Sequence, residues 1–96
     1  MILAEVKETL RTRKSNLHCK EVKALLESLG FEVRDGKRGG HKLYFHDDLP
    51  KFTSGSYNCG HGKNPEIKSA YIAKIIRVLE MQESDLKLFL KKGNEQ

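Results

Sequence analysis

Apolar residues recur every three or four positions in three segments of the chain, the spacing of one face of an α-helix. The first segment is 2–14, the second is 19–29, and the third begins near Pro65 or Ser69. The apolar positions that share these faces are Ile2, Val6, Leu10, Val22, Leu25, Leu26, Leu29, Ile72, Ile75, Ile76, Leu79, Leu86, Phe89 and Leu90. Gly30 follows the second segment, and we expect it to end that helix because glycine adopts the left-handed conformation without strain.

Three extended segments are expected between the second and third helices. Residues 31–35 alternate apolar and polar side chains, and residues 41–46 are rich in aromatic and aliphatic residues, as half-buried strands are. Residues 52–59 predict a third strand more weakly, because they include two serines and a glycine. Asp35-Gly36 is expected to open a turn between the first two strands, and Gly39-Gly40 to close it.

This order of elements predicts an α+β fold with a single domain over residues 1–96. A three-stranded antiparallel sheet with helices on one face is the simplest arrangement that buries the apolar side of each element. The α-β-β-β-α core would span about residues 17–80, and residues 1–16 would form an extra N-terminal helical extension. The core order resembles that of double-stranded-RNA-binding-like domains, although a fold alone does not fix a function.

Length and charge narrow the classes of function. Ninety-six residues exclude large multi-substrate enzymes and doubly wound cofactor-binding folds, and no apolar run is long enough to span a membrane. The N-terminal sequence MILAEVKETL lacks the features of a secretory signal, so we expect a cytoplasmic protein. The net charge is +5, and three blocks, residues 1–20, 36–46 and 61–77, each carry +3. Excess positive charge in blocks favours a polyanionic partner such as RNA.

The two cysteines, Cys19 and Cys59, are too few for a disulfide scaffold. Without an export signal we expect them to be reduced thiols, packed as small hydrophobic residues. A zinc site is the alternative, because His18 and His61 lie next to or near the cysteines and complete four ligands. Neither pair has the spacing of a standard zinc finger or ribbon.

Residues 37–42, with the sequence KRGGHK, have the most informative chemistry. Two adjacent glycines allow a sharp turn and a close approach of the backbone to a ligand. Lys37, Arg38 and Lys42 surround them with positive charge, and His41 carries an imidazole that can act as a general acid or base near neutral pH. The structural alternative is a glycine-rich hairpin with solvated lysines and an incidental histidine.

Three motifs in this order resemble the HicA family, the toxin half of a bacterial toxin–antitoxin pair. They are the helix and strand CKEVKALLESLGFEV, the strand GGHKLYFH and the segment HGKNPEIKSAYIAKII, which together fall within residues 19–79. The resemblance implies a double-stranded-RNA-binding-like fold and cleavage of mRNA without a required metal or other cofactor. It also implies a HicB-type antitoxin as protein partner.

Carried over residue by residue, the resemblance places the catalytic histidine at His41 and a motif glycine at Gly39. Gly40 stands where serine is usual in the family, so any role of that hydroxyl is absent. Tyr44 takes the place of the motif aromatic residue, and His46 that of a later histidine with either a structural or a second-site role. His61 and Lys63 match the third motif, to which we assign no catalysis; the parity of His61 with Tyr57 and Cys59 favours packing.

The residues themselves agree with RNA cleavage in outline. RNA carries its own nucleophile, the 2′-OH, so a base, an acid and positive charge around the phosphate suffice. His41 can act as the base or the acid, and the expected RNA-binding residues are Lys37, Arg38, Gly39, Gly40, Lys42 and Lys63. No metal site is expected, because the adjacent Asp47 and Asp48 would point to opposite sides of an extended chain.

Alternation within the second strand leaves one conflict open. If residues 41–46 are regular, His41, Leu43 and Phe45 share one face, while Tyr44 lies on the other. Burial of Leu43 and Phe45 would turn His41 inward, whereas the resemblance implies a buried Tyr44 and an exposed His41. A bulge could release His41, or Leu43 and Phe45 could lie on an open face that the N-terminal helix or a partner covers.

Two other functions fit the same sequence. A basic face on this fold could bind RNA through phosphates and 2′-hydroxyls without cleaving it. Alternatively, the chain could be a protein-interaction domain in which the apolar N-terminal helix docks a partner.

Overall fold

A computed structural model of the chain describes residues 2–94. Its elements follow the order α1 (Ile2–Thr12), α2 (Cys19–Ser28), β1 (Glu32–Asp35), β2 (His41–Phe45), β3 (Gly55–Asn58), α3 (Ser69–Met81) and α4 (Glu83–Asn94). No helix in this described part is both long enough and apolar enough to cross a membrane.

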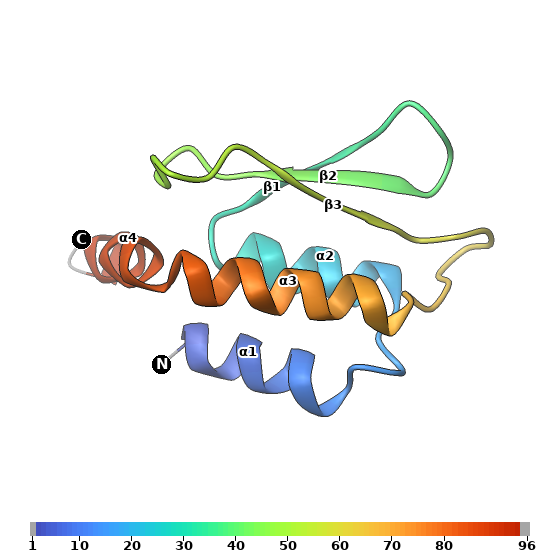
Figure 1. Cartoon of the computed structure of the whole chain (residues 1–96), viewed down its shortest axis with the longest axis horizontal. Helices are drawn as coiled ribbons and strands as arrows, with labels where there is room; N and C mark the ends of the chain where they lie inside the picture. Colours follow the sequence, from blue (N-terminus) through green and yellow to red (C-terminus); the bar gives the residue numbers. More distant parts are fainter. Residues whose placement is uncertain (1, 95–96) are drawn as a thin grey trace.

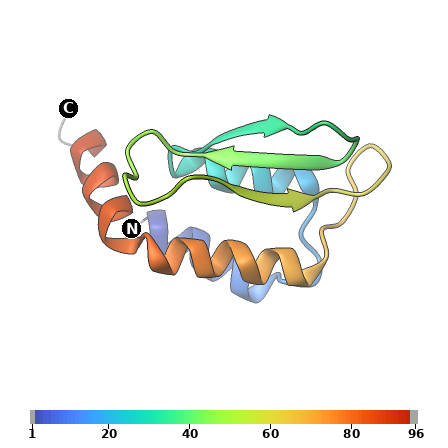
Figure 2. The same cartoon turned by 45° about the horizontal axis from the view of Figure 1, so that its top comes forward.

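The three strands form an antiparallel sheet in the order β1-β2-β3, and the helices lie on one side of it (Figure 1). Helices α2 and α3 cover one face of the sheet, and α1 lies beyond them as a third layer. Figure 2 shows the meander from its other face, which no helix of the described chain covers. The predicted α+β class, with helices on one face of a three-stranded sheet, is therefore confirmed.

Helix α1 packs against α3 rather than against the sheet. Leu3, Val6 and Leu10 are buried, whereas Ile2 is 38% exposed. In the first turn the apolar stripe therefore begins at Leu3 and not at the predicted Ile2. Two ion pairs connect α1 to the C-terminal part of the chain. Lys7 Nζ lies 2.7 Å from Glu83, and Arg11 lies 2.8 Å from Glu80. The helix is thus a fixed part of the domain that leaves the sheet face free.

Tyr44 of β2 lies at the centre of the core and is 1% exposed. The rings of Phe31 and Tyr44 pack edge to face, with their centroids 5.5 Å apart. Tyr57 of β3 is buried on the same side of the sheet. Burial raises the pKa of the Tyr44 hydroxyl to about 12. Because side chains alternate along a strand, His41, Leu43 and Phe45 lie on the opposite face of the sheet, the one that no helix of the described chain covers.

The conflict in the second strand is thereby resolved without a bulge. Leu43 and Phe45 are half-buried on a face that the N-terminal helix does not cover. Arg34 of β1 covers one of these side chains, since its guanidinium lies over the Phe45 ring, 5.0 Å from the ring centroid. The long alkyl part of an arginine shields apolar surface while its charge stays in water.

His46 belongs to the core and not to a second site. It is 6% exposed, its Nε2 lies 3.0 Å from the Leu29 carbonyl oxygen, and its Nδ1 accepts a 3.1 Å hydrogen bond from the Asp48 amide. Its ring also meets Phe89 of α4 edge-on, with centroids 4.6 Å apart. Both ring nitrogens therefore have hydrogen-bond partners, and the ring itself packs against α4.

The expectation of reduced thiols is wrong for this structure, because Cys19 and Cys59 form a disulfide bond. Their Cα atoms are 5.4 Å apart although 40 residues separate them in the sequence. The start of α2 also pairs with the segment before α3, since the Cys19 amide donates to the Pro65 carbonyl oxygen at 2.9 Å. These two segments also meet in an antiparallel bridge between His18 and Glu66. Spacing alone does not predict such contacts between distant segments.

Candidate functional site

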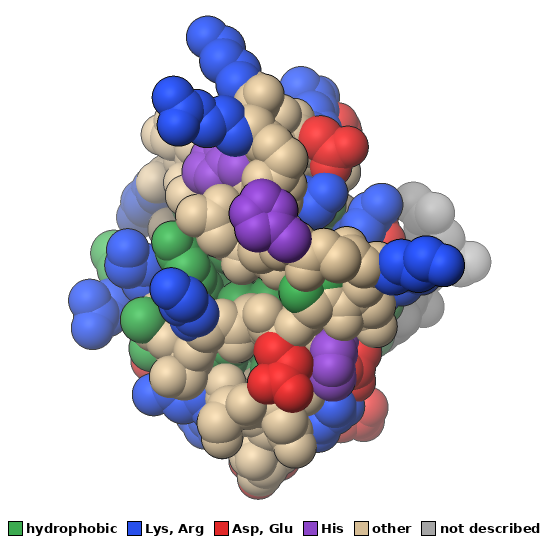
Figure 3. All heavy atoms as spheres, turned by 90° about the vertical axis from the view of Figure 1, so that its right-hand side faces the viewer, with side chains coloured by type: hydrophobic (Ala, Val, Ile, Leu, Met, Phe, Trp, Pro, Cys, Tyr) green, Lys and Arg blue, Asp and Glu red, His purple; other side chains and the backbone are tan. Residues whose placement is uncertain are grey.

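The residues of the KRGGHK segment lie at the end of the molecule where the β1–β2 turn meets the start of α3. Figure 3 shows this end, with histidine side chains near its centre and lysine and arginine side chains around them. Lys37 and Arg38 are exposed in the turn, and within residues 2–94 neither forms an ion pair. Their charges are therefore available to an anion.

His41 is the first residue of β2 and pairs with Asn58, the last residue of β3. Its Nδ1 lies 3.2 Å from Asn58 Oδ1. The amide group of Asn58 in turn donates from Nδ2 to the hydroxyl oxygen of Tyr71 at 3.1 Å. His41 Nε2 has no hydrogen-bond partner among the described residues. The imidazole is thus held at one nitrogen and free at the other.

A hollow of about 460 Å³ lies beside the ring of His41. It is lined by Gly36, Lys37, Arg38, His41, Leu43 and Asn58. The cations stand at the turn, and Leu43 supplies an apolar wall from the open sheet face. Such a hollow suits a ligand that is anionic at one part and flat and apolar at another, as a nucleotide is.

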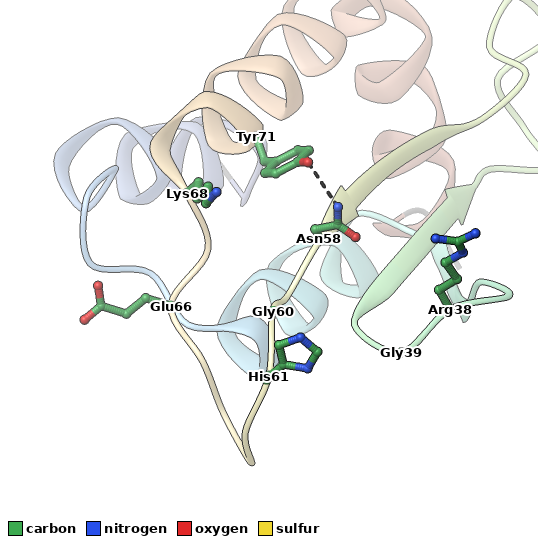
Figure 4. A pocket seen from close by; sticks show the side chains of 8 residues that line it. All are labelled: Arg38, Gly39, Asn58, Gly60, His61, Glu66, Lys68 and Tyr71. Atoms are coloured by element: carbon green, nitrogen blue, oxygen red, sulfur yellow. Dashed lines mark hydrogen bonds between the residues drawn. The ribbon is translucent and has the colours of Figure 1, made fainter.

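A second hollow of about 350 Å³ lies on the other side of Asn58. Figure 4 shows its lining residues, Arg38, Gly39, Asn58, Gly60, His61, Glu66, Lys68 and Tyr71. Arg38 and Asn58 line both hollows, so the two form adjoining parts of one surface. His41 lines the first hollow and His61 lines the second, and Arg38 lines both.

Backbone geometry gives Gly40 a specific role. Its φ is +84°, and a Cβ atom at this position would lie 2.6 Å from the Gly60 carbonyl oxygen. The Gly40 carbonyl also accepts a 2.6 Å hydrogen bond from the Cys59 amide. The turn and the end of β3 approach so closely that only glycine fits. A serine here, as is usual in the HicA pattern, would be strained in this backbone.

A methyl group at Gly36 is expected to displace the His41 ring. The Cβ of Gly36→Ala would overlap His41 Cδ2, and the ring can escape by rotating at a cost of about 1 kcal/mol. We therefore expect the hydrogen bond to Asn58 to break while the fold persists, which the ring resonances of His41 in NMR spectra would report. Gly39→Ala is the matched control, because its Cβ meets no atom within 4 Å. Unchanged His41 resonances in Gly36→Ala would contradict this geometry.

Two expected RNA-binding residues lie apart from the others. Lys42 faces away from His41 on β2 and pairs with Asp35, whose pKa it lowers through their hydrogen bond. Lys63 is exposed in the connection between β3 and α3 and lines neither hollow. The structure thus brings together Lys37, Arg38, Gly39, Gly40 and His41, and leaves these two lysines outside the group.

His61 is exposed and lines the second hollow, contrary to the packing role favoured by its parity. Alternation ends at Gly60, whose φ of +74° turns the chain out of the strand direction. Sequence reasoning also missed Asn58, Lys68 and Tyr71. Asn58 becomes visible as a partner of His41 only once the register of β2 and β3 is known.

The alternative zinc site is not assembled. Its two thiols are bonded to each other, and no group of three or more potential ligands of this kind (histidine, cysteine, aspartate, glutamate) is found among residues 2–94. His18 instead contacts Glu21 through Nδ1 at 3.2 Å, at the start of α2.

No protein-family model, curated protein or solved structure matches this chain. The site must therefore be interpreted from its own residues. Within residues 2–94 they offer the His41 imidazole, whose Nε2 has no hydrogen-bond partner, a second exposed imidazole at His61, and the cations Lys37 and Arg38, which form no ion pair.

Proposed function

We propose that this protein is an endoribonuclease that cleaves mRNA without a metal, with His41 as general acid or base. The observation that carries the proposal is the half-buried imidazole beside Lys37 and Arg38, which Asn58 fixes at Nδ1 and whose Nε2 has no partner in the described part of the chain. The resemblance to the HicA motifs implies a catalytic histidine at the same residue. Lys37, Arg38, Gly39 and Gly40 form the binding turn around it.

The reaction requires two proton transfers. His41 Nε2 takes the proton from a ribose 2′-OH, the 2′-oxygen attacks the adjacent phosphorus, and the bond from phosphorus to the 5′-oxygen breaks. The leaving 5′-oxygen takes a proton from an acid, for which His61 is the candidate because it lines the hollow that adjoins that of His41. Cations stabilise the charge that develops on the phosphate. The products are a 2′,3′-cyclic phosphate and a 5′-hydroxyl.

The direct test is incubation of the purified protein with single-stranded RNA in the presence of EDTA. Cleavage that leaves cyclic phosphate ends supports the proposal. RNA that is bound but stays intact would instead identify a non-catalytic RNA-binding module. Absence of binding at low salt would contradict both functions and favour a protein-interaction domain.

Removal of charge from the turn should weaken RNA binding and its dependence on salt. Each of Lys37→Ala and Arg38→Ala is expected to lower the slope of log K against log salt by about 0.7 for a single strand, if each side chain neutralises one phosphate. Fluorescence anisotropy over a range of salt concentrations measures this. Lys51→Ala is the control, because Lys51 is exposed but lies in the β2–β3 connection, away from both hollows. Equal slopes for all three variants would contradict the assigned interface.

The HicA resemblance further suggests a toxin that acts in the cytoplasm with a HicB-type antitoxin as partner. An antitoxin that inhibits this site would need to cover His41 and offer acidic groups to Lys37 and Arg38. Expression of the protein should arrest growth, and expression of His41→Ala should not. A small acidic protein encoded next to it should relieve the arrest when both are expressed. Arrest by both forms of the protein would contradict a toxin that acts through His41.

A further inference from the structure

We infer that Asn58 and Tyr71 are positioning residues that hold the His41 imidazole in the tautomer with its proton on Nδ1. The inference rests on the proposed role of His41 and adds two residues to its site. Its basis is a chain of two hydrogen bonds, from His41 Nδ1 to Asn58 Oδ1 at 3.2 Å and from Asn58 Nδ2 to the Tyr71 hydroxyl oxygen at 3.1 Å.

The asymmetry of an amide group makes this chain directional. An amide nitrogen can only donate and an amide oxygen can only accept. In the structure Oδ1 of Asn58 faces the imidazole and Nδ2 faces the Tyr71 hydroxyl oxygen. With the amide in this orientation, the hydrogen bond to Oδ1 requires the proton on Nδ1. In neutral histidine the other nitrogen then has a lone pair. The hydrogen bond on one side of the ring sets which nitrogen is basic on the other.

Each partner is held by its own element. Asn58 ends β3 directly opposite His41, and the next residue, Cys59, is fixed by its disulfide and by its hydrogen bond to Gly40. Tyr71 lies in the first turn of α3, half-buried, with Lys74 Nζ 5.7 Å from its ring centroid. Figure 4 shows the Asn58 and Tyr71 side chains pointing toward one another across the gap between strand and helix.

The consequence for catalysis is a base that is ready before substrate binds. Nε2 is the nitrogen without a protein partner in the described chain, and the hollow lined by Lys37, Arg38 and Leu43 lies beside the ring. A histidine in the opposite tautomer would present a donor where the 2′-OH needs an acceptor. The pair thus acts on the reaction through His41, and both side chains also line the hollows beside it.

NMR spectra that correlate ring nitrogens with ring protons report the tautomer directly, without RNA. At a pH where the ring is neutral, we expect the Nδ1–H form in the wild-type protein. Asn58→Ala should lose this preference, and Tyr71→Phe should weaken it because the amide can then turn over. Ser56→Ala, on the same face of β3, is the matched control and should leave it unchanged.

A rescue variant separates positioning from packing. In Asn58→Asp both side-chain oxygens are acceptors, so the tautomer should no longer depend on residue 71. The double variant Asn58→Asp/Tyr71→Phe should therefore regain the Nδ1–H form that Tyr71→Phe weakens. In RNA cleavage, Asn58→Ala should lower kcat at least about tenfold with little change in KM.

The outcomes for the inference and for the proposed function are distinct. An Nε2–H tautomer in the wild type, or an Nδ1–H tautomer that persists in Asn58→Ala, would overturn the positioning role whatever happens to RNA. An Nδ1–H tautomer that disappears in Asn58→Ala supports it. If RNA stays intact with the wild type in that case, the nuclease proposal is contradicted while the positioning role stands.

Discussion

His41→Ala is expected to reduce RNA cleavage by about 10²–10⁴-fold, the usual contribution of a positioned general acid or base. The variant removes the imidazole beside Lys37 and Arg38, whose Nε2 has no hydrogen-bond partner among residues 2–94. His41→Gln keeps a hydrogen-bonding side chain of similar reach but no titratable group, so it should be equally impaired. Rates of cleavage of a labelled single-stranded RNA in EDTA, at enzyme concentrations above the Kd, measure the chemical step.

Binding and folding are the controls for this result. His41 is only half-buried and its ring is not part of the core, so His41→Ala should unfold at nearly the wild-type temperature. RNA should still bind with a salt dependence close to that of the wild type, because the cations of the turn remain. Cleavage by His41→Ala at the wild-type rate would remove the central residue of the proposed mechanism.

Reduction of the Cys19–Cys59 bond is expected to lower the free energy of unfolding by about 4 kcal/mol. This value follows from the entropy that the unfolded chain regains when a loop closed across 40 residues is opened. A domain of this size has only about 5–15 kcal/mol in total, so the loss should be large. Urea denaturation with and without a dithiol reductant measures it, and thiol titration of the unfolded protein verifies the redox state.

The double variant Cys19→Ser/Cys59→Ser provides the control for reduction. It cannot form the bond, so its urea midpoint should lie below that of the oxidised wild type and should not respond to the reductant. A wild-type midpoint that is also insensitive to reductant, in a protein shown to be oxidised beforehand, would contradict a stabilising role. In a cytosol that keeps thiols reduced, the protein would therefore lack the Cys19–Cys59 bond and have the lower free energy of unfolding.

The helices and strands could be predicted because their burial patterns are local. The stripe of Val22 and Leu26 and the cap at Gly30 depend on neighbours within two turns, and all three behave as expected. The face occupied by His41 could not be predicted in the same way. It depends on which side of the sheet the helices cover, and the sequence of a strand with apolar residues on both faces does not contain that information.

The parts of the site that were missed depend on contacts between distant segments. Asn58 meets His41 only through the register of two strands, and Tyr71 meets Asn58 only through the packing of α3 on the sheet. For Lys42 no distant contact is needed, since alternation along the strand already places its side chain on the other face of the sheet from His41. Proximity in sequence to a candidate residue is thus a poor guide to membership of its site when the segment is extended.

The position of α1 offers a practical way to hold this molecule. This helix forms the layer farthest from the sheet, on the other side of α2 and α3 (Figure 1). A dye or a surface tether attached at the exposed Ala4 would therefore leave the face that bears His41 turned outward. Single molecules immobilised in this orientation could capture labelled RNA from solution without obstruction by the support.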